Sequence, residues 1–96
     1  MAIRLIVTIT AAPGRGAELA EVYQARFAQV LKEPGCEQFE FFRGVADPDR
    51  IVLIERWTDQ ASLDAHAKLQ ATRPAPPAEL RVGVSEREDY EYNRTR

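Results

Sequence analysis

The stretch from residue 33 to residue 59 constrains the fold of this chain more than any other part. Two runs rich in aromatic and β-branched residues, 36–43 and 51–58, flank a loop that contains Gly44 and Pro48. This pattern predicts an antiparallel β-hairpin, because aromatic and β-branched side chains favour strands, whereas glycine and proline favour the turn between them. Both faces of the second run carry apolar residues, so we expect both faces of the sheet to be covered.

The spacing of apolar residues switches between two and about 3.6 along the chain, which distinguishes strands from helices. Asp59 is a suitable N-cap for the second of two predicted helices. The predicted elements are strands over 3–10, 36–43, 51–58 and 80–90 and helices over 15–32 and 60–71. The resulting β-α-β-β-α-β order predicts an α+β, ferredoxin-like domain, in which two helices lie on one face of a four-stranded antiparallel sheet.

The C-terminal part of the chain leaves two interpretations open. The apolar residues Leu80, Val82 and Val84 alternate with residues 81, 83 and 85, which are not apolar. This alternation predicts the start of the fourth strand. The highly charged segment 86–96 is either a frayed tail or an extension of this strand that docks on a partner chain. A proline-rich connector, 73–78, separates the second helix from this region and cannot itself be helical.

Length and composition narrow the class of protein. The 96 residues suit a single domain, 1–96, and the core of so short a chain is modest. The net charge of −2 comes from interleaved acidic and basic residues, so we expect neither a nucleic-acid partner nor a membrane partner. No apolar run is long enough to span a membrane and no signal peptide is evident, which predicts a cytoplasmic protein. Cys36 is the only cysteine and is expected to act as a small buried hydrophobe.

A homodimer is expected because a small core is combined with apolar residues on both faces of the sheet. The side chains that we expect to point toward a partner sheet are Ile6, Thr8, Phe42, Val52 and Ile54.

Three short segments resemble the antibiotic biosynthesis monooxygenase family over about residues 3–70. They are Glu-Pro-Gly-Cys at 33–36, Glu-Arg-Trp-Thr-Asp at 55–59 and Leu-Asp-Ala-His at 63–66. The resemblance implies a dimeric α+β barrel, in which two ferredoxin-like sheets pack face to face. It also implies an oxygenase that needs no metal or other cofactor, and that oxidises an electron-rich aromatic molecule, such as a quinol or a polyketide anthrone, with O₂.

Strand and helix periodicity, together with this resemblance, select the candidate site residues. In the family, a tryptophan in the position of Trp57 lines the pocket, where it would stack on a planar ring. His66 and Glu55 are the candidate proton-transfer groups, so Trp57, His66 and Glu55 form the predicted catalytic set. Each also has a structural interpretation: Trp57 as a core residue, His66 as an ordinary helix residue and Glu55 as an ion-pair partner. The predicted substrate-binding residues are Trp57, Tyr23, Val7, Leu53 and Leu63.

Three classes of function therefore stay open. The first is a cofactor-independent monooxygenase, and the second is a cyclase, isomerase or binding protein that uses the same aromatic pocket. The third is a dimeric interaction protein without catalysis. Val7 stands where some haem-degrading relatives carry an asparagine, and His66 is the only candidate axial ligand, so haem degradation is not expected.

Overall fold

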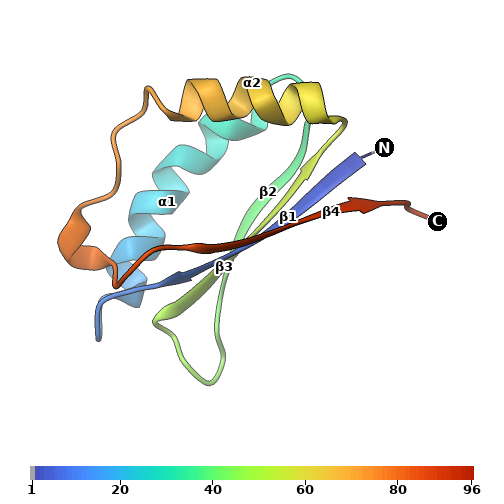
Figure 1. Ribbon diagram of the computed structural model, residues 1–96. Helices are drawn as coiled ribbons and strands as arrows, with labels where there is room; N and C mark the ends of the chain where they lie inside the picture. Colours follow the sequence, from blue (N-terminus) through green and yellow to red (C-terminus); the bar gives the residue numbers. More distant parts are fainter. Residues whose placement is uncertain (1) are drawn as a thin grey trace.

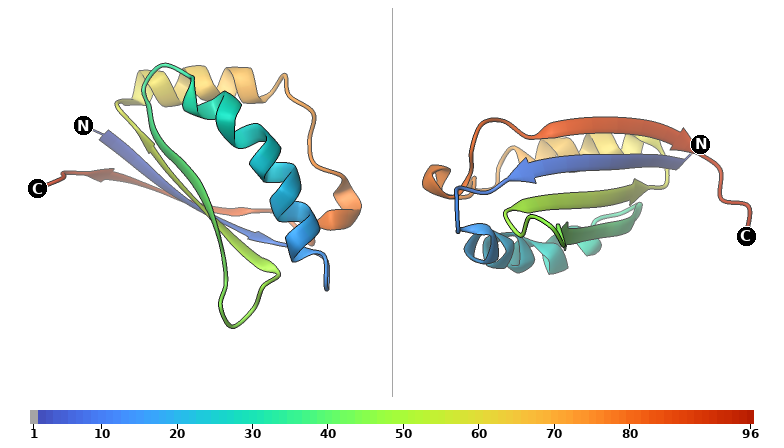
Figure 2. Two further views of the ribbon diagram at one scale, coloured as in Figure 1. Left: turned by 180° about the vertical axis from the view of Figure 1, so that it is seen from behind. Right: turned by 90° about the horizontal axis from the view of Figure 1, so that it is seen from below.

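The computed structural model describes residues 2–96 and contains the predicted α+β arrangement (Figure 1). Its elements are β1 (Ala2–Thr10), α1 (Gly16–Leu31), β2 (Cys36–Arg43), β3 (Arg50–Trp57), α2 (Gln60–Gln70), the 3₁₀ turn η1 (Ala78–Leu80) and β4 (Glu86–Tyr92). The strands form one antiparallel sheet in the order β2-β3-β1-β4. Both helices lie on one face of this sheet, as Figure 2 shows. The ferredoxin-like fold is therefore confirmed.

Strand alternation sends one set of side chains toward the helices. In the central pair of strands, Leu5 lies opposite Glu55 and Val7 lies opposite Leu53. Trp57, at the end of β3, is fully buried in a core cluster beneath the two helices. A second core cluster surrounds Ile51 at the other end of β3. The helix-facing side of β3 is therefore apolar except at Glu55, where a carboxyl group faces the helices.

The segment that joins α1 to β2 is held tightly against the start of α2. Gly35 has φ +82°, a left-handed conformation, and a Cβ at this position would lie 2.2 Å from Ser62 Oγ. The backbone N–H of Thr58 donates to the Gly35 carbonyl at 2.9 Å. The side chain of Asp59 accepts from the Ser62 N–H at 2.8 Å, which confirms Asp59 as the N-cap of α2. Glycine is required here because the turn and the helix approach so closely.

The fourth strand does not begin where the sequence predicts. Leu80 is buried in η1, whereas Val82 and Val84 are exposed, and the strand runs from Glu86 to Tyr92 instead. Gly83 has φ +67°, so the chain turns at the point where the apolar alternation continues. The charged segment can form β4 because an edge strand needs backbone partners, which β1 supplies, and leaves most of its side chains in solvent.

The strand β2 contains a register shift between Cys36 and Gln38, consistent with a β-bulge at Glu37. Cys36 lies opposite Trp57 and packs against the core, although simple alternation assigns it to the same face as Gln38. Burial is the main reason that the pKa of its thiol is raised to about 11, so the thiol is protonated at neutral pH. The prediction that Cys36 acts as a small hydrophobe is therefore consistent with its placement.

No helix among residues 2–96 is both long enough and apolar enough to cross a bilayer.

Candidate functional site

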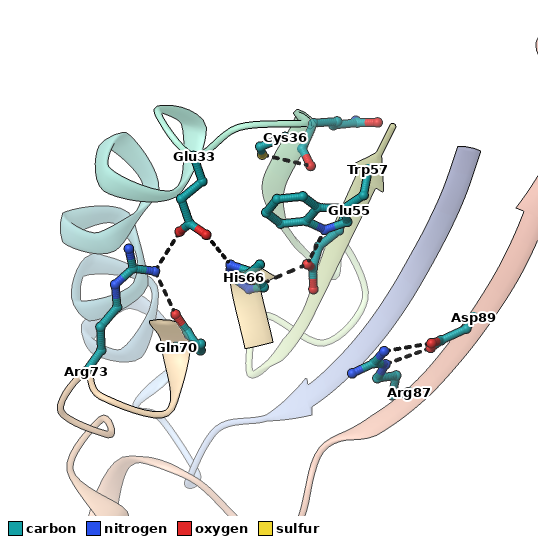
Figure 3. Close-up of polar contacts among 10 residues, drawn as sticks. Glu33, Cys36, Glu55, Trp57, His66, Gln70, Arg73, Arg87 and Asp89 are labelled. Carbon is teal, nitrogen blue, oxygen red and sulfur yellow. Dashed lines mark hydrogen bonds and ion pairs between the residues drawn. The ribbon is translucent and has the colours of Figure 1, made fainter. Parts of the chain in front are cut away.

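A cluster of polar side chains lies beneath α2 in an otherwise apolar interior (Figure 3). Among residues 2–96, the buried residues with a carboxyl or imidazole side chain are Glu55 and His66. Glu55 comes from β3 and His66 from α2, so the packing of the helix on the sheet brings them together. Buried titratable groups are costly to keep in a core, and they concentrate at functional sites.

One nitrogen of His66 faces away from the sheet toward the α1–β2 turn. Its Nδ1 lies 2.9 Å from Oε1 of Glu33. The other oxygen of Glu33, Oε2, accepts from Arg73 at 2.8 Å, and the same Arg73 nitrogen is 2.9 Å from Oε1 of Gln70. Figure 3 shows this row of side chains running from Arg73 through Glu33 to His66. The turn and the proline-rich connector thus meet at one side of the imidazole.

The other nitrogen of His66 faces Glu55. The distance from Nε2 to Glu55 Oε1 is 4.0 Å, which is too long for a hydrogen bond. The same Oε1 accepts from the indole N–H of Trp57 at 2.9 Å. The Trp57 and His66 rings lie side by side, with centroids 4.6 Å apart and planes inclined by 32°. Trp57 therefore holds Glu55 by hydrogen bonding and supports His66 by ring contact.

The environment of Glu55 favours its protonated form. Burial raises the pKa of this carboxyl above its ordinary value, and the hydrogen bond from Trp57 and the nearby His66 oppose that rise only in part. A carboxyl with a raised pKa can exchange a proton at a pH closer to neutrality than an exposed glutamate can. Glu55 and His66 are thus two titratable groups within one buried site.

A cavity of about 370 Å³ adjoins these two residues. It lies between α2 and the sheet, and Arg87 of β4 forms part of its wall. Its polar lining comes from Glu55, His66, Gln70 and Arg87, and the rest of the wall is aliphatic and aromatic. Arg87 makes two contacts of 2.6 Å to the carboxylate of its neighbour Asp89. The volume falls in the range of about 300 to 1,000 Å³ typical of small-molecule sites. A mainly apolar pocket with a few converging polar groups suits a small aromatic ligand that carries a hydroxyl or carbonyl oxygen.

The residues selected from the sequence are distributed unequally around this cavity. Those that line it are Val7, Leu53, Glu55, Leu63 and His66. Trp57 lies behind Glu55 and does not line the cavity. Tyr23 belongs to the second core cluster, where its ring stacks on Phe41 with centroids 4.9 Å apart. The structure therefore brings five of these residues together, adds Trp57 as a support and separates Tyr23 from the cavity.

Sequence reasoning missed Glu33, Arg73 and Arg87. Glu33 belongs to a turn, Arg73 opens the connector and Arg87 lies in the charged C-terminal segment, so none stands in an informative periodic pattern. Glu33 opens the Glu-Pro-Gly-Cys segment that carries the family resemblance, whereas the position of Arg87 opposite Val7 depends on the pairing of β4 with β1. No group of three or more side chains arranged to hold a metal ion was found among residues 2–96.

Comparison with known proteins gives one family and many structures with this fold. The sequence profile described as "Antibiotic biosynthesis monooxygenase" matches residues 2–75. PA3566 from Pseudomonas aeruginosa is 28% identical with a TM-score of 0.81, and the match covers 97% of this chain and 95% of PA3566. A conserved protein from Methanosarcina mazei Go1 is 21% identical with a TM-score of 0.80 and coverage of 97% and 94%. A crystal structure named antibiotic biosynthesis monooxygenase is 19% identical with a TM-score of 0.75 and coverage of 96% and 99%. None of the curated proteins matches the chain.

Proposed function

Because this chain belongs to the antibiotic biosynthesis monooxygenase family, we propose that it is a monooxygenase for an electron-rich aromatic substrate, of the quinol or polyketide-anthrone type. The observation that carries this proposal is the mainly apolar pocket with Glu55 and His66 in its wall. Such a substrate matches the cavity in both respects, since its rings are flat and apolar and its hydroxyl group can exchange a proton. The substrate itself supplies the electrons, so the reaction needs no metal or organic cofactor.

In the proposed reaction, the ring system lies against the aliphatic wall and its hydroxyl oxygen points toward His66 and Glu55. Removal of the phenolic proton produces an anion that is a much better electron donor to O₂ than the neutral phenol. For an anthrone-type substrate, a ring CH₂ becomes C=O, one oxygen atom of O₂ enters the product and the other leaves in water. Atoms and electrons then balance without a further reductant, because the substrate loses the two hydrogens that the water contains.

The polar residues of the wall divide the remaining work. His66 Nε2 is the proposed base, since it faces the cavity side of α2 and lies 4.0 Å from Glu55. Arg87 lies at the cavity wall with its guanidinium paired to Asp89, and its remaining N–H groups can donate to the developing anion. Trp57 orients Glu55 through its indole N–H and remains outside the cavity.

A second function uses the same site without oxygen. Two proton-transfer groups beside an apolar cavity also suit an isomerase or cyclase, which moves a proton between two atoms of one substrate. A binding protein or a dimeric interaction protein would need neither group. Oxygen consumption separates the monooxygenase from the isomerase or cyclase, and turnover of any kind separates these enzymes from the binding protein and the interaction protein.

The test is oxygen uptake and product formation with a panel of quinols and anthrones. Wild-type protein is expected to consume O₂ with at least one of them, and His66→Ala is expected to lower the rate by about 10² to 10⁴, the usual contribution of a general base. Glu18→Gln is the matched control, because Glu18 is an exposed α1 residue that pairs with Arg15 far from the cavity. Turnover under nitrogen would support the isomerase instead, and no conversion of any compound would refute an enzymatic role.

We also propose that the chain acts as a homodimer. The sheet face opposite the helices carries Ile6, Val52 and Ile54, which are half-buried within one chain, and Phe42, which is 43% exposed. A second copy packed on this face would remove these side chains from water, as the family resemblance implies. The β4 strand pairs with β1 of its own chain, so the proposed contact uses the face of the sheet.

A further inference from the structure

We propose that Glu33, held by Arg73, is a positioning residue that keeps a hydrogen on Nδ1 of His66 and leaves the Nε2 lone pair free toward the cavity. This inference rests on the proposed function for its catalytic meaning. The arrangement that it describes is a property of the resting protein and can be tested without a substrate.

The hydrogen-bond pattern fixes the roles of the three groups. A guanidinium is always charged and only donates, so the oxygen of Glu33 that it contacts at 2.8 Å must accept. A carboxylate paired in this way has no hydrogen of its own to donate. The 2.9 Å contact between Glu33 Oε1 and His66 Nδ1 therefore requires the hydrogen to lie on Nδ1. In a neutral imidazole, the hydrogen on one nitrogen leaves a lone pair on the other.

On the cavity side of His66, no contact in the described part of the chain favours a hydrogen on Nε2 instead of Nδ1. No hydrogen bond to Nε2 of His66 forms within residues 2–96, and the nearest carboxylate oxygen, Glu55 Oε1, is 4.0 Å away. That oxygen already accepts from Trp57. The remaining neighbours of the imidazole include the rings of Trp57 and Phe39, which support it by contact. The free lone pair of His66 thus faces the side where the proposed substrate binds.

Burial makes the positioning strong. The side chains of Glu33 and His66 are each only 8% exposed, so water cannot readily replace either partner. A hydrogen bond to a charged group is one of the strong ones, and it is stronger where water is excluded. The wrong tautomer would also leave two acceptors facing each other. One form of His66 should therefore dominate.

The proline-rich connector gains a role from this arrangement. Arg73 lies at its start and also contacts Gln70 at the end of α2, while the guanidinium of Arg26 in α1 donates to the carbonyl oxygen of Pro74. The connector is therefore tied to both helices next to Glu33. In this way a segment without regular structure sets the orientation of a group in the site.

The experiment is nitrogen NMR of the imidazole at alkaline pH, where the ring is uncharged. His66 is the only histidine of the chain, so ¹⁵N-labelled protein gives a single pair of ring nitrogens without the need for assignment. The wild type is expected to show a protonated Nδ1 and an unprotonated Nε2. This measurement needs no variant, and the opposite tautomer or an equal mixture would overturn the proposal.

Variants identify the residue responsible. In Glu33→Gln, the amide oxygen is expected to accept from Arg73 and the amide N–H₂ to donate to Nδ1, which moves the ring hydrogen to Nε2. Arg73→Leu leaves the carboxylate in place, so the wild-type tautomer should persist. Glu18→Gln, which removes an exposed carboxylate from another arginine pair, is the control and should change nothing. An unchanged tautomer in Glu33→Gln would overturn the assignment of Glu33.

Oxygen uptake then separates this inference from the proposed function. If wild-type protein consumes O₂, Glu33→Gln should lower the rate by about tenfold or more, because Nε2 would no longer accept a proton. If no compound is oxidised, the proposed function fails, while the tautomer measurements still decide whether Glu33 positions His66.

Discussion

Replacing Trp57 with phenylalanine should destabilise the protein, and the loss should depend on pH. Trp57 is fully buried, and its indole N–H makes the 2.9 Å hydrogen bond to Glu55 Oε1. Phenylalanine retains an aromatic ring in the core but has no N–H. The variant therefore removes one hydrogen bond from a buried carboxyl and leaves a small space where the second ring of the indole lay.

The size of the effect follows from two contributions. A hydrogen bond to an ionised group contributes about 1.5 to 3 kcal/mol to the free energy of unfolding, against about 0.5 to 1.5 kcal/mol for a neutral pair. The space left by the smaller ring, roughly 40 Å³, adds about 1 kcal/mol. The total is roughly 2.5 to 4 kcal/mol when Glu55 is ionised. For a domain of this size, that loss lowers the melting temperature by roughly 10 to 30 °C.

The direction of the pH dependence follows from the raised pKa of Glu55. Folding favours the protonated carboxyl, so the stability present below its ordinary value of 4.5 is lost as pH rises through the higher folded-state pKa. The Trp57 hydrogen bond opposes this rise in pKa. Without it, the folded-state pKa is higher still, and stability falls further with increasing pH. The Trp57→Phe penalty should therefore be larger at pH 8 than at pH 4.5.

The assay is urea unfolding followed by circular dichroism at both pH values. Ile51→Val is the control, because Ile51 is equally buried in the other core cluster and its variant should lose about 0.5 to 1.5 kcal/mol at either pH. In a double-mutant cycle, Glu55→Gln should reduce the Trp57→Phe penalty at pH 8. A penalty that is the same at both pH values, or unaffected by Glu55→Gln, would refute the role assigned to this hydrogen bond.

Three further predictions test other parts of the structure. Leu80→Ala should lower the free energy of unfolding in urea by about 2 to 5 kcal/mol, because Leu80 is buried in η1. Val84→Ala should lower it by less than about 0.5 kcal/mol, because Val84 is exposed, and equal losses would contradict this placement of the two residues. Ile54→Glu should give the monomer mass in light scattering where the wild type gives the dimer mass, and a monomeric wild type would refute the homodimer. If the monooxygenase proposal holds, the oxidation rate of wild type should fall as pH rises through the raised pKa of Glu55, whereas Glu55→Gln should lack that fall.

The fold could be predicted well where side-chain periodicity is strong. Both helices end within one residue of the predicted limits, because their apolar stripes and the Asp59 cap are local signals. The fourth strand could not be placed, because Val82 and Val84 continue the alternation of Leu80 although Gly83 turns the chain there. The strand that forms instead carries charge on both faces. Its position depends on backbone pairing with β1, which is a tertiary property.

The site was predictable only in part for a related reason. Glu55 and His66 lie on the inward faces of β3 and α2, and periodicity identifies inward faces. The contacts of Glu33 with His66 and with Arg73 join residues 33 and 40 positions apart, and both begin in segments without periodicity. The sequence places Arg73 only in a proline-rich connector. Its contact with Glu33 arises only after α1, α2 and the turn between α1 and β2 have packed together.

The two carboxyl groups beside His66 differ in their surroundings, and this difference separates their roles. Glu33 is paired with a guanidinium and acts only as an acceptor, whereas Glu55 has no cation in contact and burial raises its pKa. An ionised Glu55 would repel the phenolate that the proposed reaction forms next to it. A protonated Glu55 would instead donate a hydrogen bond to that oxygen while its Oε1 still accepts from Trp57. The proposed chemistry therefore assigns proton removal to His66, orientation of the ring to Glu33 and stabilisation of the anion to neutral Glu55.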